Sequence, residues 1–294
     1  MELQVVLPDE SPAMPARTLV DLAQRAEGLG YTTAWLPDHV LPPGPYGATF
    51  GGVYEPLVTI GHLTAVTERL RFGTSVLVVP LRDPFVLAKQ VATLHQLSGG
   101  RVVLGVGVGW NVPEFDAVGA DHSRRGAVTD DSLALLRHLF AGGPAPYEGR
   151  RFSYEQGVFE PVPDGSVPIM VGGNSDAALR RAARYGDVWQ GLPASPAAFA
   201  ERVAVLAGMT GGGSAGSGSA GTGAGTGTGT GTAGGRAVAP ALRIGWDGRT
   251  PVGQVADAVV AYREAGAAQL AVHFGEHEGT AQRMTALVEA LATR

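Results

Sequence analysis

The chain has 294 residues, of which 45% are hydrophobic and 17% charged, so a large core is available and general disorder is excluded. A formal net charge of -5 argues against a nucleic-acid-binding protein, which would present a basic face. The absence of cysteine excludes disulfides, thiolate metal sites and a cysteine nucleophile, and it suits a reducing cytoplasm.

The first residues, 1–8, have the pattern of a β-strand and lack the basic start and apolar run of a secretory signal. No stretch approaches the roughly 20 apolar residues that a membrane-spanning helix needs. We therefore expect a soluble, cytoplasmic protein that has neither a membrane nor a nucleic acid as its partner.

Short apolar runs alternate with helical patterns along the chain, as in βα units around a parallel sheet. Eight strands are predicted, at residues 2–7, 33–36, 71–79, 101–107, 167–171, 187–191, 239–245 and 269–274. Each is followed by a predicted helix, at residues 15–29, from 55 onward, 84–97, 123–140, 175–185, 196–207, 252–264 and 280–292. This strict alternation predicts an α/β fold, a (β/α)8 TIM barrel forming a single domain over residues 1–294. A doubly wound open sheet is the alternative, because the number of strands does not establish closure.

Residues 211–235 contain only Gly, Ser, Ala and Thr. Such a tract has no apolar side chains with which to form a core, so it is predicted to be a flexible, disordered insertion. It falls between the sixth helix and the seventh strand, a connection at the end of a barrel opposite the active site. We therefore expect it to take no part in the chemistry.

Polar residues that directly follow a strand point at the active site of a barrel, and Asp38 and His39 follow the second strand. A carboxylate beside an imidazole can orient the ring, bind a cofactor or help to move a proton. The alternative is a pair that only stabilises the loop.

After the third strand, Arg82 is a candidate for binding an anionic substrate, although an Arg-Asp pair before a helix is more often a salt bridge or a cap.

Glycines alternate at the end of the fourth strand, at Gly105, Gly107 and Gly109, and Trp110 and Asn111 follow them. Without Cβ atoms, this backbone lets a flat ring lie against it. The spacing differs from that of a dinucleotide-binding fingerprint.

After the fifth strand, Gly172, Gly173 and Asn174 precede Ser175 and a helix. A tight turn at a helix N-terminus can bind a phosphate, whereas the ordinary reading is a capped helix. No His and carboxylate spacing in the sequence indicates a catalytic metal.

Three ordered segments together resemble the luciferase-like monooxygenase superfamily, in particular its branch of deazaflavin-dependent oxidoreductases. They are AEGLGYTTAWLPDH at 26–39, FGTSVLVVPLRDPFVLAKQVATLHQLSGGRVVLGVGVGWNVPEF at 72–115, and PIMVGGNSDAALRRAARYGDVW at 168–189. The resemblance implies that Asp38 and His39 face the ring of the cofactor. It also implies a cis peptide between Ser75 and Val76 behind that ring.

The same resemblance assigns further cofactor contacts. Backbone lining the cofactor is implied at Gly107, Val108 and Gly109, with Trp110 beside the ring, and a phosphate-binding turn at Gly172, Gly173 and Asn174. Two departures stand out. Trp110 replaces the glutamate that donates a proton in the sugar-phosphate dehydrogenases of this family, and Val128 stands where relatives often carry an arginine. The second departure weakens a phosphate role for that helix start. Because of Trp110, and because Lys89 is the only lysine and lies in a predicted helix, glucose 6-phosphate is disfavoured as a substrate.

The resemblance implies an oxidoreductase that uses coenzyme F420 for hydride transfer to or from a small organic substrate. His39 is the expected proton relay, with Asp38 orienting it or the cofactor. The loops 40–53 and 144–166 are expected to shape a pocket for an apolar or aromatic substrate. Their aromatic residues, with the residue that follows the first loop, are Tyr46, Phe50, Tyr54, Tyr147, Phe152 and Tyr154.

Two alternatives keep the same fold. One is a monooxygenase that uses reduced FMN and oxygen, and the other is a barrel that binds a flavin or deazaflavin without catalysis. Relatives are commonly dimers, so a homodimer is expected by analogy.

Overall fold

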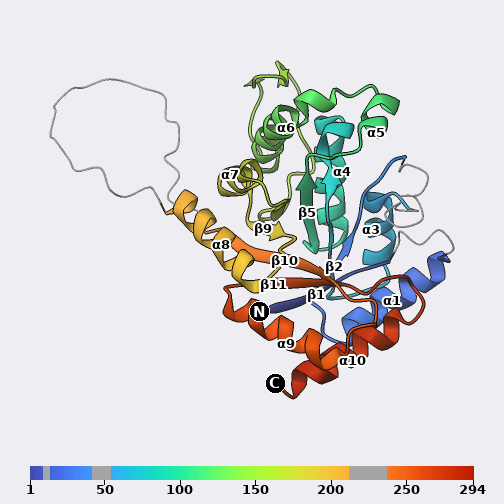
Figure 1. Ribbon diagram of the computed structural model, residues 1–294. Coiled ribbons are helices and arrows are strands. Elements are labelled where there is room, and N and C mark those ends of the chain that lie inside the picture. The colour runs from blue at the N-terminus through green and yellow to red at the C-terminus, as the bar shows by residue number, and fades with distance from the viewer. Residues whose placement is uncertain (9–13, 42–53, 212–236) are drawn as a thin grey trace.

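The computed structural model describes residues 1–8, 14–41, 54–211 and 237–294. Its main sheet is parallel, and helices surround it (Figure 1). The strands of this sheet are β1 (Glu2–Val6), β2 (Thr33–Leu36), β3 (Arg71–Thr74), β4 (Leu77–Val78), β5 (Val102–Gly107), β8 (Ile169–Gly172), β9 (Val188–Gly191), β10 (Ala239–Gly245) and β11 (Gln269–His273).

The sheet closes on itself. Its order is β3-β2-β1-β11-β10-β9-β8-β5-β4, and β3 also pairs with β5. In that closing pair, Phe72 lies opposite Val102 and Gly73 opposite Val103. An open doubly wound sheet would leave two unpaired edges, so the closing pair excludes that alternative and confirms the predicted barrel.

The predicted third strand, 71–79, is interrupted in the structure. It consists of β3, a break at Ser75 and Val76, β4, and a 3-10 turn over Val79–Leu81. Its β-branched composition favours an extended chain throughout, and the break cannot be read from that pattern. The two short strands occupy one position in the barrel, which therefore has eight strand positions.

The helices follow the strands as the sequence predicts. They are α1 (Ala16–Gly28), α3 (Pro56–Thr64), α4 (Pro84–Leu97), α6 (Arg125–Phe140), α7 (Asp176–Tyr185), α8 (Pro196–Thr210), α9 (Val252–Glu264) and α10 (Thr280–Ala292). Side-chain caps start several of them: Asp83 accepts from the amides of Phe85 and Val86 before α4, and Ser175 accepts from Ala178 before α7.

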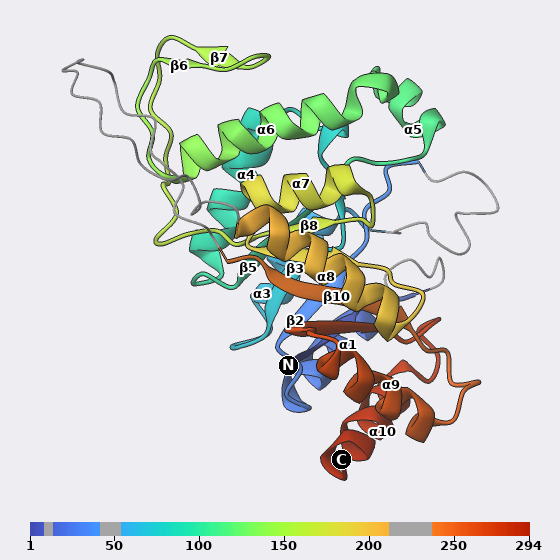
Figure 2. The ribbon, with the colours of Figure 1, turned by 60° about the vertical axis from the view of Figure 1, so that its left-hand side comes forward.

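Two additions to the predicted elements lie outside the barrel. A short helix, α5 (Val112–Ala117), and a 3-10 turn at His122–Arg124 lie between β5 and α6. The segment that joins α6 to β8 contains an antiparallel hairpin, β6 (Tyr147–Glu148) and β7 (Ser153–Tyr154). In Figure 2 this hairpin stands on the outer side of α6, away from the strands.

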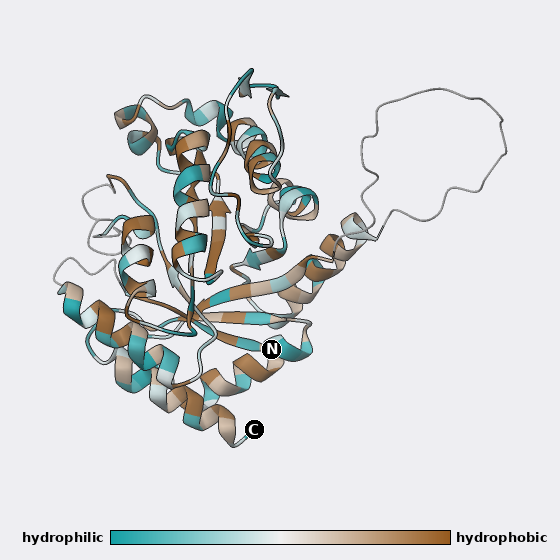
Figure 3. Cartoon of the chain, turned by 180° about the vertical axis from the view of Figure 1, so that it is seen from behind, coloured by the Kyte–Doolittle hydropathy of each residue, from teal (hydrophilic) through white to brown (hydrophobic). Residues whose placement is uncertain are grey.

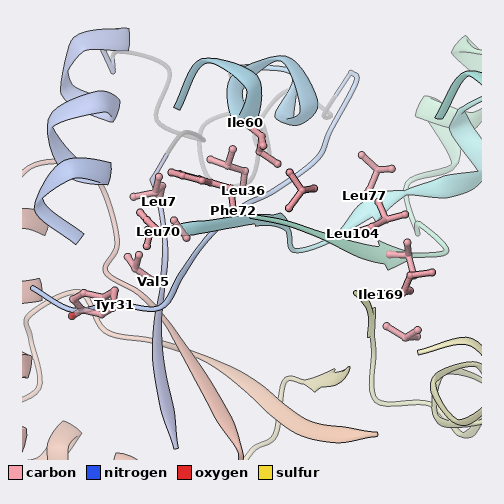
Figure 4. Packing of buried hydrophobic residues seen from close by; sticks show 14 of the residues in the cluster. Val5, Leu7, Tyr31, Leu36, Ile60, Leu70, Phe72, Leu77, Leu104 and Ile169 are labelled. Carbon is pink, nitrogen blue, oxygen red and sulfur yellow. The ribbon is translucent and has the colours of Figure 1, made fainter. Parts of the chain in front are cut away.

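The buried apolar residues form two separate clusters, one between strands and helices and one inside the barrel. In the outer cluster, Ile60 of α3 points toward the strands that carry Leu36 and Phe72 (Figure 4). The inner cluster contains Val6, Trp35, Val103, Met170, Val188, Ala241 and Ala271. Because both faces of the strands are covered, the strands are apolar on both sides, and Figure 3 shows much of the sheet in brown.

The low-complexity tract, 211–235, lies almost entirely outside the described residues. It connects α8, which ends at Thr210, to β10, which begins at Ala239. Those ends lie opposite the carboxyl ends of the strands, as the sequence predicts. Among the described residues, no helix combines the length and the apolar character that crossing a membrane requires.

Candidate active site at the mouth of the barrel

The mouth of the barrel is the end at which the carboxyl ends of the strands meet. Side chains alternate along a strand, so residues two positions beyond the inner cluster also face the interior. Counted from the inner cluster, these residues are Gly105, Gly172, Gln190, Arg243 and His273. The interior therefore changes toward the mouth from an apolar layer to glycines on one side and polar groups on the other.

Val76 occupies the space that the glycines leave. A Cβ atom on Gly107 would lie 2.3 Å from Val76 Cγ2, and one on Gly172 would lie 2.6 Å from Val76 Cγ1. Only glycine at these two positions lets the valine side chain enter between β5 and β8. The peptide bond between Ser75 and Val76 is cis, as the sequence resemblance implies. We call Val76, Gly107 and Gly172 the glycine–valine floor.

Polar groups lie beside this floor. The Ser75 hydroxyl donates to Gln190 Oε1 at 2.6 Å, and Arg243 Nη1 donates to the Ser75 carbonyl at 3.2 Å. Gln190 is 5% exposed, and its Nε2 has no hydrogen-bond partner among the described residues. Because a buried amide donor without an acceptor is costly, this atom indicates a place for a ligand oxygen.

His39 is held by a residue of a different loop. Its Nδ1 lies 3.0 Å from Oε2 of Glu114, on α5. Asn111 Nδ2 donates to the same oxygen at 3.0 Å, while the amides of Val40 and Leu41 donate to Oε1 at 2.7 and 3.0 Å. The buried carboxylate thus fixes both the imidazole and the loop that carries it.

The charge of Glu114 follows from these contacts. Burial favours the neutral acid, but hydrogen bonds from His39, Leu41 and Asn111 outweigh it and lower the pKa of Glu114. An ionised carboxylate only accepts hydrogen bonds, so Nδ1 of His39 carries a proton. Nε2 is then the imidazole atom that can take up or release a proton at the mouth.

The Asp38 carboxylate binds Arg82, although the sequence predicts that it orients the imidazole of His39 or the cofactor. Its carboxylate accepts two hydrogen bonds from Arg82, at 2.7 and 2.8 Å, and one from the amide of Val78 at 2.8 Å. Arg82 also contacts Glu55 at 3.2 Å. The orienting role therefore belongs to Glu114, and Asp38 ties the His39 loop to the end of the third strand. Arg82 forms the structural salt bridge that was the alternative to substrate binding.

In the predicted phosphate-binding turn, residues 172–174, several polar groups already form hydrogen bonds within the protein. Asn174 Nδ2 donates to the Leu192 carbonyl, and Asn174 Oδ1 accepts from the Leu192 amide, both at 2.8 Å. The Gly173 carbonyl accepts from Trp189 Nε1 at 2.8 Å. The asparagine side chain thus joins the loops after β8 and β9. The Gly173 amide also donates to the Gln190 carbonyl at 3.1 Å. A phosphate contact at Gly172, Gly173 and Asn174 stays a prediction.

The residues after Gly107 lie near His39 and the third strand. Gly109 has a φ of +76°, and a Cβ there would lie 2.6 Å from Val78 Cγ1, so packing and turn geometry account for this glycine. Trp110 is 53% exposed, and its ring packs edge-on against His39 with centroids 5.9 Å apart. The predicted cofactor contacts of Val108, Gly109 and Trp110 are not tested by this geometry.

The segment 144–166 packs on α4 and α6, and its expected part in shaping the substrate pocket stays a prediction. This segment leaves the C-terminal end of α6, so it starts at the end of the barrel opposite the mouth. Tyr154 packs edge-on against Phe85 of α4. The ring of Tyr147 lies 4.6 Å from that of His138 on α6, tilted by 36°. Tyr54 donates to the Met14 carbonyl. The other predicted lining segment lies mostly at 42–53, outside the described residues.

Exposed apolar side chains gather in the loops that follow strands β2, β5 and β9. These residues are Val40, Leu41, Trp110, Val112 and Leu192. Glu114 joins the loops after β2 and β5, and Asn174 joins the loop after β9 to the loop after β8. These side chains give the rim of the mouth an apolar character. Below the rim, the glycine–valine floor lies on one side and the polar groups of Ser75, Gln190 and Arg243 lie on the other.

These residues fit a flat heteroaromatic ring. The glycine–valine floor offers a surface without protruding polar groups, and Gln190 Nε2 offers a donor for a ring carbonyl. Within the described residues, no group of three His, Cys, Asp or Glu side chains could hold a metal ion.

Sequence reasoning missed Glu114 and Gln190. Glu114 lies three residues after Asn111, in the first turn of a short helix that was not predicted. Gln190 lies in the predicted sixth strand, where a polar residue in an apolar run is the available signal.

Comparison with known proteins agrees with this geometry. Residues 1–212 match the model of a family described as luciferase-like monooxygenases. An uncharacterised protein of Mycobacterium tuberculosis is 36% identical over 183 residues, which cover 58% of this chain and 63% of that protein. An F420-dependent glucose-6-phosphate dehydrogenase of Nakamurella multipartita is 33% identical over 172 residues, covering 58% of this chain and 50% of the dehydrogenase. The matched region thus spans between half and two thirds of these relatives.

Solved structures show the same fold. An F420-dependent secondary alcohol dehydrogenase, in complex with an F420–acetone adduct, superposes with a TM-score of 0.77 at 17% identity, covering 99% of each chain. A type II Baeyer–Villiger monooxygenase of Pseudomonas putida, in complex with FMN, gives a TM-score of 0.76 at 14% identity, covering 100% of this chain and 98% of that one.

Proposed function

The chain belongs to the luciferase-like monooxygenase family, an oxidoreductase family, and we propose that it uses coenzyme F420 for hydride transfer to or from a small organic substrate. The observation that carries this proposal is the His39–Glu114 pair at the mouth of the barrel, in the loop after β2. Relatives named as F420-dependent dehydrogenases support the choice of cofactor.

A bound deazaflavin would supply the hydride donor or acceptor. The glycine–valine floor would hold its ring, and Gln190 Nε2 would donate to a polar edge of that ring. Its phosphate would lie at the turn before α7, where the Gly173 amide already donates to the Gln190 carbonyl, so the amide of Asn174 would be the contact. Each of these groups belongs to a strand end, so the barrel fixes their relative positions before the ligand binds.

His39 would manage the proton that accompanies hydride transfer. Glu114 keeps the proton on Nδ1, so Nε2 can accept a proton from an alcohol, or return one to a carbonyl oxygen when His39 is protonated. The exposed indole of Trp110 against the imidazole edge would limit the access of water to the ring. Asp38 would act through Arg82, by holding the loop.

The substrate would be small and apolar or aromatic. The apolar rim supports this class, since Val40, Leu41, Trp110, Val112 and Leu192 lie around the opening. Glucose 6-phosphate stays disfavoured despite the similarity to dehydrogenases of that name. Position 110 is tryptophan, and Lys89, the only lysine of the chain, donates to the Glu160 carbonyl outside the barrel.

Equilibrium dialysis of the purified protein with oxidised F420, and separately with FMN, tests the choice of cofactor. Micromolar binding of F420 and much weaker binding of FMN is the expected result. Preference for FMN would contradict the proposal and favour a monooxygenase, which the FMN-bound structural neighbour makes the second candidate. Oxygen consumption with reduced cofactor separates the two, because a deazaflavin lacks the nitrogen next to the carbon at which flavins form the peroxide adduct.

A barrel that binds the cofactor without catalysis is tested by His39→Ala. If the protein is an enzyme, this variant should bind F420 and stay folded while its turnover falls.

We also propose a homodimeric, cytoplasmic protein. Light scattering after size exclusion would give twice the monomer mass of 30.2 kDa if the dimer forms.

A further inference from the structure

A second cavity lies outside the barrel, apart from the residues of the mouth. It has a volume of about 510 Å³ and lies between the first half of α6, the end of α7 and the β6–β7 hairpin. In Figure 2 the β6–β7 hairpin stands at the upper left, and α6 and α7 extend to the right of it. Sites for small molecules usually measure about 300 to 1,000 Å³, so this cavity has the size of a small-molecule site. We call it the outer cavity.

Arginines dominate the charge of the outer cavity. Its charged lining residues are Arg124, Arg150, Arg151, Arg184, Asp130 and Asp131. Both carboxylates are already paired: Asp130 with the buried Arg181 at 2.6 Å, and Asp131 with Arg151 at 3.4 Å. Within the described ranges, no carboxylate lies within ion-pair distance of Arg124, Arg150 or Arg184. Arg124 also interacts electrostatically with Asp121, so Arg150 and Arg184 carry the cavity charges that no described carboxylate pairs with.

Aromatic side chains form the rest of the lining, namely Tyr147, Phe152 and Tyr185. Arg184 already lies over the ring of Tyr185, 5.0 Å from its centroid. Burial is the main factor that raises the pKa of both tyrosines, so the phenols stay neutral and add no negative charge. A flat apolar group can pack on such rings while an anion contacts the guanidinium groups.

The cavity has a fixed frame. Arg181, which is 8% exposed, binds Asp130 and the Gly126 carbonyl and so holds α7 against α6. On the other side, Tyr147 stacks on Tyr154 with centroids 6.0 Å apart and packs on His138 of α6. The arginines thus converge on a concave space rather than a flat surface.

We propose that the outer cavity binds a small organic phosphate with an aromatic ring, the class to which mononucleotides belong. A phosphate monoester carries up to two negative charges on three terminal oxygens, so it can pair with more than one guanidinium group, whereas a carboxylate has one charge and two oxygens. A small ligand is favoured over a macromolecule because the cavity volume is that of a small-molecule site, although one side of it is open to solvent. The site is independent of the hydride chemistry at the mouth.

Calorimetric titration of the full chain tests this proposal, with AMP as the probe and adenosine and inorganic phosphate as separate comparisons. We expect saturable binding of AMP that weakens with added salt, and weaker binding of both comparison compounds. Inorganic phosphate binding as tightly as AMP would overturn the organic part of the proposal. No saturable binding of AMP at millimolar concentration would overturn the site.

Variants locate the binding. The exposed pair Arg150→Ala/Arg184→Ala removes two cavity charges and should weaken AMP binding more than tenfold, since both substitutions remove charge-assisted hydrogen bonds to the phosphate. The control Arg17→Ala/Arg69→Ala removes the same charge from exposed positions elsewhere and should bind AMP like the parent. Equal weakening in both variants would assign the binding to net charge and overturn the proposal. Slower hydrogen exchange in residues 147–152 on addition of AMP is the second expected result.

Discussion

Glu114 accepts a hydrogen bond from His39 at 3.0 Å, although 75 residues separate them in the chain. The carboxylate is 2% exposed and also binds the amides of the two residues that follow His39. One side chain thus determines which imidazole nitrogen carries a proton and where the loop after β2 lies. This links the backbone of the mouth to its proton chemistry.

Glu114→Gln should change the tautomer of His39. The amide can still accept from Val40 and Leu41 through its oxygen, but its NH2 group then faces Nδ1, which must become an acceptor. We expect turnover to fall by about two to four orders of magnitude, the usual contribution of a positioned acid or base. Nitrogen-15 NMR of His39 should show the proton moved from Nδ1 to Nε2, a readout that needs no substrate. An unchanged tautomer would contradict this role, and exposed Glu68→Gln is the matched control.

The lowered pKa of Glu114 predicts a pH dependence of stability. A carboxyl group whose pKa is lower in the folded state contributes stability above its ordinary value of 4.5, and this contribution is lost as the pH falls through the folded-state pKa. As the pH is lowered from 4.5, the free energy of unfolding of the parent should therefore decrease. That of Glu114→Gln, which lacks this carboxyl group, should decrease less. Urea unfolding of both proteins between pH 3 and 7 checks this, and parallel curves would contradict it.

Gly107→Ala tests the glycine–valine floor. The added methyl would lie 2.3 Å from Val76 Cγ2, so we expect a loss of about 1–3 kcal/mol in unfolding free energy, together with weaker F420 binding. The double variant Gly107→Ala/Val76→Ala removes the overlap and should recover much of the stability. In the control, Gly208→Ala, the methyl meets nothing within 4 Å on helix α8, so stability should rise by about 0.5–1 kcal/mol. Additive effects of the two floor substitutions would show that the contact is absent.

The barrel and most helix limits follow from the sequence because each βα unit has its own periodicity and caps. Asp83 before α4 and Ser175 before α7 are local signals of this kind. The partners of the site are different, because they depend on which loops the closed barrel brings together. The neighbours Asp38 and His39 suggest a pair, yet Arg82 and Glu114 bind them instead. The reason is that adjacent residues of an extended chain point in opposite directions.

Asp38→Asn should destabilise the protein rather than remove a reacting group. It leaves Arg82, whose side chain is 15% exposed, without its bidentate partner. Breaking a largely buried pair costs about 3 kcal/mol, and thermal unfolding should show this loss. Removing the exposed partner in the Arg17–Asp21 pair by Asp21→Asn should cost under about 1 kcal/mol. Full stability with abolished turnover would instead return Asp38 to a direct role in the chemistry.

Gln190→Met tests the polar groups that lie beside the glycine–valine floor. Methionine keeps the length and most of the volume of glutamine, but it loses both the acceptor for Ser75 and the buried Nε2 donor. The lost hydrogen bond and the removal of an unpaired donor oppose each other, so the unfolding free energy should change by less than about 1 kcal/mol. F420 binding should weaken by about three- to tenfold if Nε2 donates to the ring. Ser75→Ala is the matched control, since it removes the same hydrogen bond and leaves Nε2 in place. Equal weakening in both variants would show that the shared loss of the Ser75–Gln190 hydrogen bond accounts for the effect, and that the buried Nε2 donor meets no ligand.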